Sequence, residues 1–383
     1  MPPRLVLRLP ALVPALVPAL ALVLAVGLGL TTAPTSAASA TQPGGTPTGA
    51  GRAQVVFGEP GVPRIRRTLT ALLRAAPAGA TVRGVTWSFA SRPLADELVR
   101  ADRRGVTVRV LAGAVACREP AFRSLRSRLR APSAARCVRD SARGRARFAG
   151  RPAHLHQKSW TATRSGGDRW VSVVTSANAT AVADRAQWND AVVVRGGRAL
   201  HDRLAGLFRS QWRNRPVDRP FRRWSVGPGS TLEAGPWHSP RMTDPVLRRL
   251  AEVPARGARI TVAHSNWQDA RGERIARALA AKQRGGAQVR VLTSRPHSGR
   301  VRDLLAAAGI PQRSVWVGPR RYSHLKVVTA AWPTAGGALA TRVWTGSENL
   351  WSPSRGHDEL VLGLSSPAVH AAYDAFLDRL WRR

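Results

Sequence analysis

The first part of the chain alternates between strand-like and helix-like patterns of apolar residues. Residues 82–89 are rich in β-branched and aromatic side chains, and residues 94–104 have the spacing of an amphipathic helix. A second apolar run covers residues 106–111 and follows Gly105, a residue that favours the end of a helix. This order predicts a strand, a helix and a second strand.

The same order returns later in the chain. Residues 260–265 form an apolar run, residues 273–284 have helical spacing, and residues 289–292 form another run after two glycines. Strands that alternate with helices predict a layered α/β fold. We therefore expect two similar α/β/α half-domains with mixed sheets, packed face to face about a pseudo-twofold axis.

Each half is expected to close with the same kind of helix. Residues 201–212 and 373–381 both have amphipathic spacing and end on a tryptophan. The stretch between the halves contains many prolines, glycines and arginines, which is typical of a connector. The predicted boundaries are a first half at 54–213, a connector at 214–236 and a second half at 237–383.

The N-terminus has the pattern of a secretory signal. Two arginines precede an apolar run at residues 11–30, and a stretch of small residues ends at Ala40. We expect residues 1–40 to be a signal peptide that is cleaved after Ala40, so that the protein is secreted, and residues 41–53 to be a flexible linker. An uncleaved membrane anchor is the alternative, because twenty apolar residues can span a bilayer.

The charge balance is strongly basic. The chain has 60 Lys and Arg against 22 Asp and Glu, a net charge of +38. Removal of the predicted signal takes away two arginines and no acid, which leaves +36. Such a surface attracts nucleic acid, teichoic-type polymers or anionic lipid headgroups, or is basic without a specific partner. Nothing in the sequence indicates an obligate protein partner.

The chain has two cysteines, Cys117 and Cys137. In an exported protein, two cysteines this close in sequence predict one disulfide. This bond would constrain the loop after the strand that ends near residue 111. Two separate reduced thiols are the alternative.

Three lysines occur in the chain, and two of them share one short pattern. His156-Gln157-Lys158 and His324-Leu325-Lys326 both place a lysine two residues after a histidine. An aspartate follows 34 residues after each histidine, and a Ser-x-Asn string lies in between. The chain thus carries one cassette twice, with the further members Ser176, Asn178, Asp190, Ser347, Asn349 and Asp358.

The chemistry of the cassette suits a phosphodiester. Residues i and i+2 of a strand share a face, so two histidines, two lysines and two asparagines can converge on one cationic pocket. Ammonium and amide groups would stabilise the charge on the phosphoryl oxygens. One imidazole would attack phosphorus, and the other would protonate the leaving oxygen and then activate water. Asp190 and Asp358 are the natural candidates to orient the two rings.

No cofactor or metal is expected, because the lysines supply the positive charge. His154 and His156 form a His-x-His pair, but the sequence offers no third metal ligand near them.

The paired HxK strings, with downstream SxN and an acidic residue, resemble the phospholipase D superfamily and its HxKxxxxD signature. The resemblance covers residue 55 to the C-terminus and implies a two-lobed α/β fold. It implies that His156 acts as nucleophile and His324 as general acid. The phosphate would be bound by Lys158, Lys326, Asn178 and Asn349, and Ser176 and Ser347 are expected to contribute to substrate binding.

The sequence departs from this signature. Thr163 and Ala331 stand where an aspartate is expected, five residues past each lysine. The acid that orients each histidine is also open: some members carry it one residue earlier, at the positions of Asn189 and His357, and Glu359 competes with Asp358.

These observations predict an exported, metal-independent phosphodiesterase that works through a phosphohistidine and hydrolyses phospholipids. A secreted nuclease on the same scaffold is the first alternative, and a non-catalytic polyanion-binding protein is the second.

Overall fold

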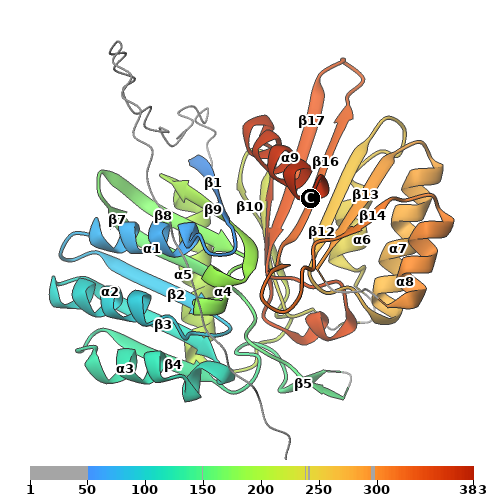
Figure 1. Ribbon diagram of the computed structural model, residues 1–383. Helices are drawn as coiled ribbons and strands as arrows, with labels where there is room; N and C mark the ends of the chain where they lie inside the picture. The colour runs from blue at the N-terminus through green and yellow to red at the C-terminus, as the bar shows by residue number, and fades with distance from the viewer. Residues whose placement is uncertain (1–50, 149, 238, 240–241, 295–297) are drawn as a thin grey trace, which may run out of the picture. The chain divides into compact units, whose positions relative to one another are not determined.

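The computed structural model describes residues 51–148, 150–237, 239, 242–294 and 298–383, which form two sheets with helices packed on them (Figure 1). The predicted signal peptide and most of the predicted linker lie outside the described residues. Of the helices that are described, none is long and apolar enough to cross a membrane.

The first sheet has the strand order β1-β9-β8-β7-β2-β3-β4, and β15 of the second half adds to β9. Strands β2, β3 and β4 are parallel to one another, β15 is parallel to β9, and the other neighbours are antiparallel. The bounds are β1 (Arg52–Gly58), β2 (Thr81–Thr86), β3 (Thr107–Gly113), β4 (Ala134–Val138), β7 (Ser159–Ser165), β8 (Asp168–Thr175), β9 (Gln187–Arg195) and β15 (Tyr322–Ser323). A separate short hairpin joins β5 (Arg147–Phe148) to β6 (Arg151–Pro152).

The second sheet repeats this arrangement in the order β10-β11-β18-β17-β16-β12-β13-β14. Strands β12, β13 and β14 are again parallel, and the rest are antiparallel. The bounds are β10 (Arg222–Gly227), β11 (Ser230–Ala234), β12 (Arg259–His264), β13 (Gln288–Thr293), β14 (Gln312–Ser314), β16 (Lys326–Pro333), β17 (Leu339–Gly346) and β18 (Leu360–Leu364). The two matching mixed sheets confirm the predicted α/β class with two similar halves.

Helices cover both faces of each sheet (Figure 1). On the first sheet, α1 to α3 pack on one face and α5 on the other; on the second sheet, α6 to α8 pack on one face and α9 on the other. The helices are α1 (Arg64–Arg74), α2 (Arg92–Arg103), α3 (Pro120–Arg128), α4 (Ala181–Arg185), α5 (Arg198–Arg213), α6 (Pro245–Ala251), α7 (Asp269–Arg284), α8 (Gly299–Ala307) and α9 (Pro367–Trp381), with short 3₁₀ turns η1 (Ala114–Arg118) and η2 (Ser352–Gly356).

Local sequence explains the ends of α2, the helix predicted at 94–104. The Ser91 hydroxyl accepts a hydrogen bond from the Leu94 amide at 3.4 Å, and Pro93 lies in the first turn. After the helix, Gly105 has a φ of +87°, a conformation that glycine adopts without a steric penalty. The predicted stop at Gly105 is confirmed.

One apolar cluster is shared by the two halves and joins them. It contains side chains of β8, β9 and α5 from the first half together with side chains of β16, β17, β18 and α9 from the second. Burial of this apolar surface holds the inner faces of the halves together. The cluster includes Val174, Trp188, Val192, Leu204, Val327, Val343, Leu362 and Tyr373.

The predicted connector at 214–236 is wrong for most of its length. Residues 222–234 form the hairpin β10–β11, which extends the second sheet at one edge. Side chains of Val226, Leu232 and Ala234 are buried in the shared core, so this hairpin is part of the second half. The linker also ends earlier than predicted, because β1 begins at Arg52.

The structure joins Cys117 and Cys137 in a disulfide, with Cα atoms 5.8 Å apart. The bond connects η1, which follows β3, to the neighbouring strand β4. The oxidation state of this pair in solution stays a prediction.

Candidate active site

The two HxK strings lie at matching positions, each at the start of a central strand. Lys158 directly precedes β7, and Lys326 is the first residue of β16. The residue between His and Lys points away from the site in both strings. Gln157 accepts a hydrogen bond from the Gln211 amide of α5 at 2.9 Å, and Leu325 is buried in the shared core.

Each string is held in place by the backbone of the other half. The His156 amide donates to the Asp358 carbonyl at 3.1 Å, and the Asp358 amide donates to the His154 carbonyl at 2.9 Å. In the same way, the His324 amide donates to the Trp188 carbonyl at 2.8 Å, next to the β15–β9 pair. These crossed contacts bring both histidines to one site between the halves.

The two imidazoles have different partners on Nδ1. The Nδ1 of His156 lies 2.9 Å and 3.0 Å from the carboxylate oxygens of Glu359. The Nδ1 of His324 lies 3.1 Å from the amide oxygen of Asn189 and 3.1 Å from the Ser176 carbonyl. These oxygens accept hydrogen bonds, so Nδ1 carries the proton and Nε2 is left free to react.

Glu359 and Asn189 occupy equivalent positions in the two halves. The Ser176 amide donates to the carbonyl that follows Asn189, and the Ser347 amide donates to the carbonyl that follows Glu359. The Ser176 hydroxyl donates to Asn189 Oδ1 at 3.2 Å, and the Ser347 hydroxyl donates to Glu359 Oε2 at 2.6 Å. The site is therefore symmetric in geometry and asymmetric in charge.

The expectation that Asp190 and Asp358 orient the histidines is wrong. Neighbouring residues of a strand point to opposite faces, so Asp190 points away from the side that Asn189 faces. The Asp190 carboxylate accepts from the Tyr373 hydroxyl at 2.5 Å and from the Thr345 hydroxyl. The Asp358 carboxylate accepts from the Ala142 amide at 2.5 Å. Both aspartates therefore link the two halves and do not contact a catalytic ring.

Ser176 and Ser347 were expected to bind substrate, but both are fully buried. Their hydroxyls are engaged with Asn189 and Glu359, as described above. The structure therefore gives them a positioning role beneath the histidines.

The two asparagines differ in their surroundings. Asn178 is half-buried, and its side-chain oxygen has no hydrogen-bond partner among the described residues. Asn349 is 8% exposed, and its side-chain oxygen accepts from the Ser265 hydroxyl at 3.4 Å. That hydroxyl also accepts from Lys326 Nζ at 2.8 Å. Ser265 is a member of the site that the sequence analysis did not select.

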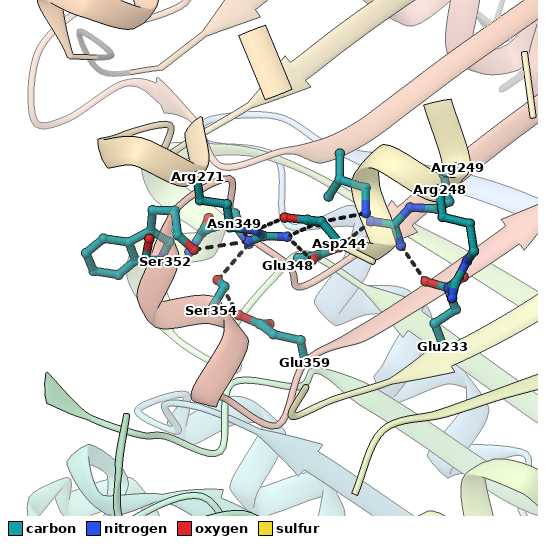
Figure 2. A network of polar contacts seen from close by, with 12 residues as sticks. Glu233, Asp244, Arg248, Arg249, Arg271, Glu348, Asn349, Ser352, Ser354 and Glu359 are labelled. Atoms are coloured by element: carbon teal, nitrogen blue, oxygen red, sulfur yellow. Dashed lines mark hydrogen bonds and ion pairs between the residues drawn. The ribbon is translucent and has the colours of Figure 1, made fainter. Parts of the chain in front are cut away.

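A buried ion network fixes the loop that carries Asn349 (Figure 2). Arg271 of α7 donates to Asp244 at 2.8 Å and 3.1 Å, to Glu348 at 2.6 Å and to the Asn349 carbonyl at 2.8 Å. Ser354, in the same loop, donates to Glu359 Oε1 at 2.9 Å. The network thus reaches the carboxylate that faces His156. Nothing in the spacing of Arg271 or Ser354 indicated this role from sequence.

The lysine ammonium groups are buried in the centre of the site. Lys158 Nζ donates to the His156 carbonyl at 2.5 Å, and Lys326 Nζ donates to the His324 carbonyl at 2.9 Å. Burial lowers the pKa of Lys158 to about 7, although the Glu359 charge opposes this shift. Burial and the Lys158 charge lower the pKa of Lys326 well below its usual range.

Both catalytic candidates are held neutral. Burial, followed by the charges of the two lysines, lowers the pKa of His156 and of His324 well below the ordinary value of 6.5. Neutral imidazoles can act as nucleophiles near pH 7. A phosphodiester in the site would add a negative charge and favour protonation of the ring that donates to the leaving group.

Aromatic and histidine rings surround His156. The Trp87 ring lies 5.9 Å from the His156 ring between centroids, and the His357 ring also lies 5.9 Å from it. His357 Nδ1 accepts from the His154 amide at 3.1 Å, and burial lowers its pKa to about 3. The side chains of His154 and His357 thus line the site beside His156. Within the described part of the chain, no three His, Cys, Asp or Glu side chains form a group that could hold a metal.

The residues that replace the signature aspartates lie away from the reacting groups. Thr163 and Ala331 are five residues past the lysines, roughly 16 Å along the strand. The Thr163 hydroxyl accepts from the Thr81 amide at 2.9 Å, and Ala331 is buried. Their substitution therefore leaves the histidines, lysines and asparagines of the site in position.

Comparison with known proteins agrees with this geometry. Residues 69–212 match the family described as "Cardiolipin synthase, PLD-like domain". No curated protein matches the chain. Among solved structures, phosphatidylserine synthase from Haemophilus influenzae has 12% identity and a TM-score of 0.62, covering 86% of this chain and 86% of that chain.

Polyphosphate kinase from Porphyromonas gingivalis has 14% identity and a TM-score of 0.56, covering 86% of this chain. The match spans half the length of that kinase. Nuc, a phospholipase D family member from Salmonella typhimurium, has 18% identity and a TM-score of 0.33, covering 42% of this chain and 95% of that chain. At these identities the likenesses to the synthase and to the kinase show the fold alone.

Proposed function

We propose that the chain, in which residues 69–212 match a PLD-like domain family, is a secreted phosphodiesterase of the phospholipase D superfamily that hydrolyses phospholipids through a phosphohistidine intermediate. The observation that carries the proposal is the convergence of His156, His324, Lys158 and Lys326 on one site between the halves. The family description and the likeness to phosphatidylserine synthase support a phospholipid as substrate.

The difference between Glu359 and Asn189 supports His156 as the nucleophile. After attack on phosphorus, the phosphorylated imidazole of the nucleophile carries a positive charge. The Glu359 carboxylate, 2.9 Å from Nδ1 of His156, stabilises that charge. The neutral amide of Asn189 gives His324 no such stabilisation, which makes a protonated His324 the stronger acid.

The reaction then proceeds in two balanced steps. His156 Nε2 forms a bond to phosphorus while the bond to the leaving oxygen breaks, and His324 gives its Nε2 proton to that oxygen. Water next attacks phosphorus, His324 takes the proton from the water, and the bond between phosphorus and His156 breaks. Lys158, Lys326, Asn178 and Asn349 stabilise the phosphoryl oxygens in both steps. This route uses no metal ion, so EDTA is expected to leave the rate unchanged.

The test is a turnover assay of the mature protein on phosphatidylcholine vesicles and on single-stranded DNA, in EDTA. We expect choline release by the wild-type protein, and a loss of at least about three orders of magnitude in His156→Ala and in His324→Ala. Near-normal turnover in either variant would contradict the two-histidine mechanism, and strong inhibition by EDTA would contradict metal independence.

The same variants distinguish the roles of the two histidines. With an activated substrate such as bis(p-nitrophenyl) phosphate, whose leaving group needs little protonation, His324→Ala is expected to release a burst of nitrophenol and to accumulate phosphorylated His156. The His156→Ala variant should give no burst. A burst in His156→Ala and none in His324→Ala would reverse the assignment.

A nuclease is the second candidate, favoured by one observation. The net charge of +38 suits a polyanionic substrate better than a zwitterionic lipid. Release of nucleotides without release of choline would decide for this alternative. Inactivity on both substrates, with tight and salt-sensitive DNA binding, would instead favour the non-catalytic polyanion-binding protein.

A further inference from the structure

The two halves differ in charge on the sheet face beside their closing helices. In the second half this face contains a cavity of about 430 Å³ between β12, β13 and α9. Arg290 of β13 is neutralised there: its guanidinium lies 2.6 Å from the Asp378 carboxylate and donates to the Thr261 hydroxyl at 2.9 Å. The same guanidinium stacks on the ring of Trp381, 5.6 Å from its centroid.

The first half has the same construction without the acid. Arg109 of β3 is the third residue of its strand, as Arg290 is of β13, and Trp212 in α5 matches Trp381 in α9. Three residues before the tryptophan, α9 has Asp378 and α5 has Arg209. The second half therefore serves as a reference for the first. At the position where α9 carries a carboxylate that forms an ion pair, α5 carries a guanidinium.

Further arginines enlarge the positive charge on this face. Arg83 of β2 lies in register with Arg109, and Arg136 of β4 follows on the next strand. The Trp212 ring lies between two of them, with its centroid 6.0 Å from the Arg109 guanidinium and 5.1 Å from that of Arg136. We refer to these side chains as the Arg–Trp face: Arg83, Arg109, Arg136, Arg209 and Trp212.

Across the described ranges, no acidic side chain forms an ion pair with an arginine of the Arg–Trp face. Asp202 of α5 is near, but it lies 3.5 Å from Arg198 and 3.2 Å from His201. Burial, and then the charges of Arg209 and Arg109, lower the pKa of Arg83. Mutual repulsion among these guanidinium groups destabilises the free protein, and a bound anion would relieve it.

We propose that the Arg–Trp face binds single-stranded nucleic acid. Arg83 and Arg109 are directly paired on adjacent strands, with their backbones roughly 4.8 Å apart, and Arg136 lies on the next strand, two residues further along, opposite Leu111. Guanidinium groups spread in this way across three adjacent strands suit the phosphates of a linear chain. The half-buried Trp212 ring stacks on Phe208 of the same helix, with ring centroids 5.3 Å apart, and its solvent-exposed part, next to these arginines, can contact a base. This inference does not depend on which substrate the active site hydrolyses.

A bilayer fits the face less well. Membrane docking needs exposed apolar side chains that insert among the lipids. The large exposed hydrophobic residues of the described chain lie outside β2, β3, β4 and α5: Val62, Val115, Val182, Val317 and Leu339.

The experiment measures the binding of fluorescein-labelled oligo(dT) by anisotropy over a range of salt concentrations. The test variant is Arg109→Gln/Arg136→Gln. The matched control is Arg123→Gln/Arg126→Gln, which removes the same charge from exposed positions of α3, on the opposite face of the sheet. Thermal unfolding of each variant verifies that it remains folded.

We expect the test variant to raise Kd at least about tenfold and to reduce the salt slope by about two, while the control changes Kd less than about twofold. Trp212→Leu should raise Kd about tenfold with an unchanged salt slope, because it removes stacking and no charge. Equal effects of the two double variants would show attraction by net charge alone and would overturn the proposal. Absence of oligonucleotide binding would also overturn it, as would a test variant that loses binding to phosphatidylglycerol vesicles but not to the oligonucleotide.

Discussion

At the scale of single residues, the two buried lysines determine the pH range in which the site can hold an anion. An ammonium group is charged below its pKa, and the pKa of Lys158 is lowered to about 7. The pKa of Lys326 is lowered further by burial and by Lys158. Above neutral pH the empty site therefore loses positive charge, and an anion can bind only if the lysines take up protons again.

This predicts that anion affinity falls as the pH rises above 7. For a phosphonate monoester, whose own charge is constant in this range, the inhibition constant should rise about tenfold per pH unit for each lysine that must regain a proton. Lys158→Arg should flatten the profile, since a guanidinium stays protonated. An inhibition constant that is the same on both sides of pH 7 would contradict the lowered lysine pKa values.

The candidate reacting groups could be predicted from sequence, but the choice among the candidate groups that orient them could not. His156, Lys158, His324 and Lys326 are repeated in one recognisable string, and a pattern of i and i+2 residues on a strand defines a shared face. The orienting role fell one residue away, on Glu359 and Asn189. A one-residue difference in strand register reverses which side chain faces the site, and spacing along the chain does not determine that register.

At the scale of elements, the network around Arg271 sets the position of the loop between β17 and β18. Arg271 is fully buried and contacts two carboxylates, Asp244 and Glu348, together with backbone carbonyls of the loop (Figure 2). In the first half the residue before Asn178 is Ala177, where the second half has Glu348 before Asn349. The loops that carry Asn178 and Asn349 are thus stabilised by different means.

We predict that Arg271→Met lowers the free energy of unfolding by about 3 to 5 kcal/mol, because it leaves the buried Asp244 carboxylate without its ion-pair partner, while Glu348 keeps its ion pair with Arg249. Urea unfolding measures this loss. The control is Arg277→Met on the same helix, where an exposed ion pair with Glu273 contributes at most about 1 kcal/mol. If both variants lose the same stability, the network has no special structural role.

Sequence patterns predicted the main helices and strands. They missed the hairpin β10–β11, because its composition concealed the alternation of buried and exposed side chains. The prolines, glycines and arginines of residues 216–236 indicated a connector. Within that stretch, Trp224 and Val226 point inward while Arg223 and Ser225 are exposed, which is the period of an edge strand. Edge strands carry many polar residues, so composition alone separates them poorly from loops.

At the scale of the whole molecule, the halves are joined by an apolar core and by two buried aspartates. Asp190 of the first half accepts a hydrogen bond from Tyr373 of the second, and Asp358 of the second half accepts one from the Ala142 amide of the first. Burial raises the pKa of Asp358 to about 7 from an ordinary value of 3.8. The junction between the halves is therefore sensitive to pH.

This predicts that the contribution of Asp358 to stability falls between about pH 4 and pH 7, while the buried histidines His156, His324 and His357, whose pKa values are lowered, contribute in the opposite direction. In that range Asp358 keeps its proton in the folded protein but loses it on unfolding, so its contribution is complete below pH 4 and is lost as the pH approaches 7. The shift corresponds to roughly 4 kcal/mol. Measured by urea unfolding relative to the wild type, the free energy of unfolding of Asp358→Asn should rise by this amount between pH 4 and pH 7, whereas the control Asp303→Asn, at an exposed position, should follow the wild-type profile. Parallel pH profiles of the Asp358→Asn variant and the wild type would refute the prediction.

The crossed contacts also bear on how the duplicated sequence can change. A duplication ordinarily leaves one copy free to drift while the other keeps the activity. Here His156 depends on Glu359, 203 residues away in the other copy, and His324 depends on Asn189. Neither copy can therefore replace the other. A substitution in either half affects the one activity to which both halves contribute, so selection acts on both copies.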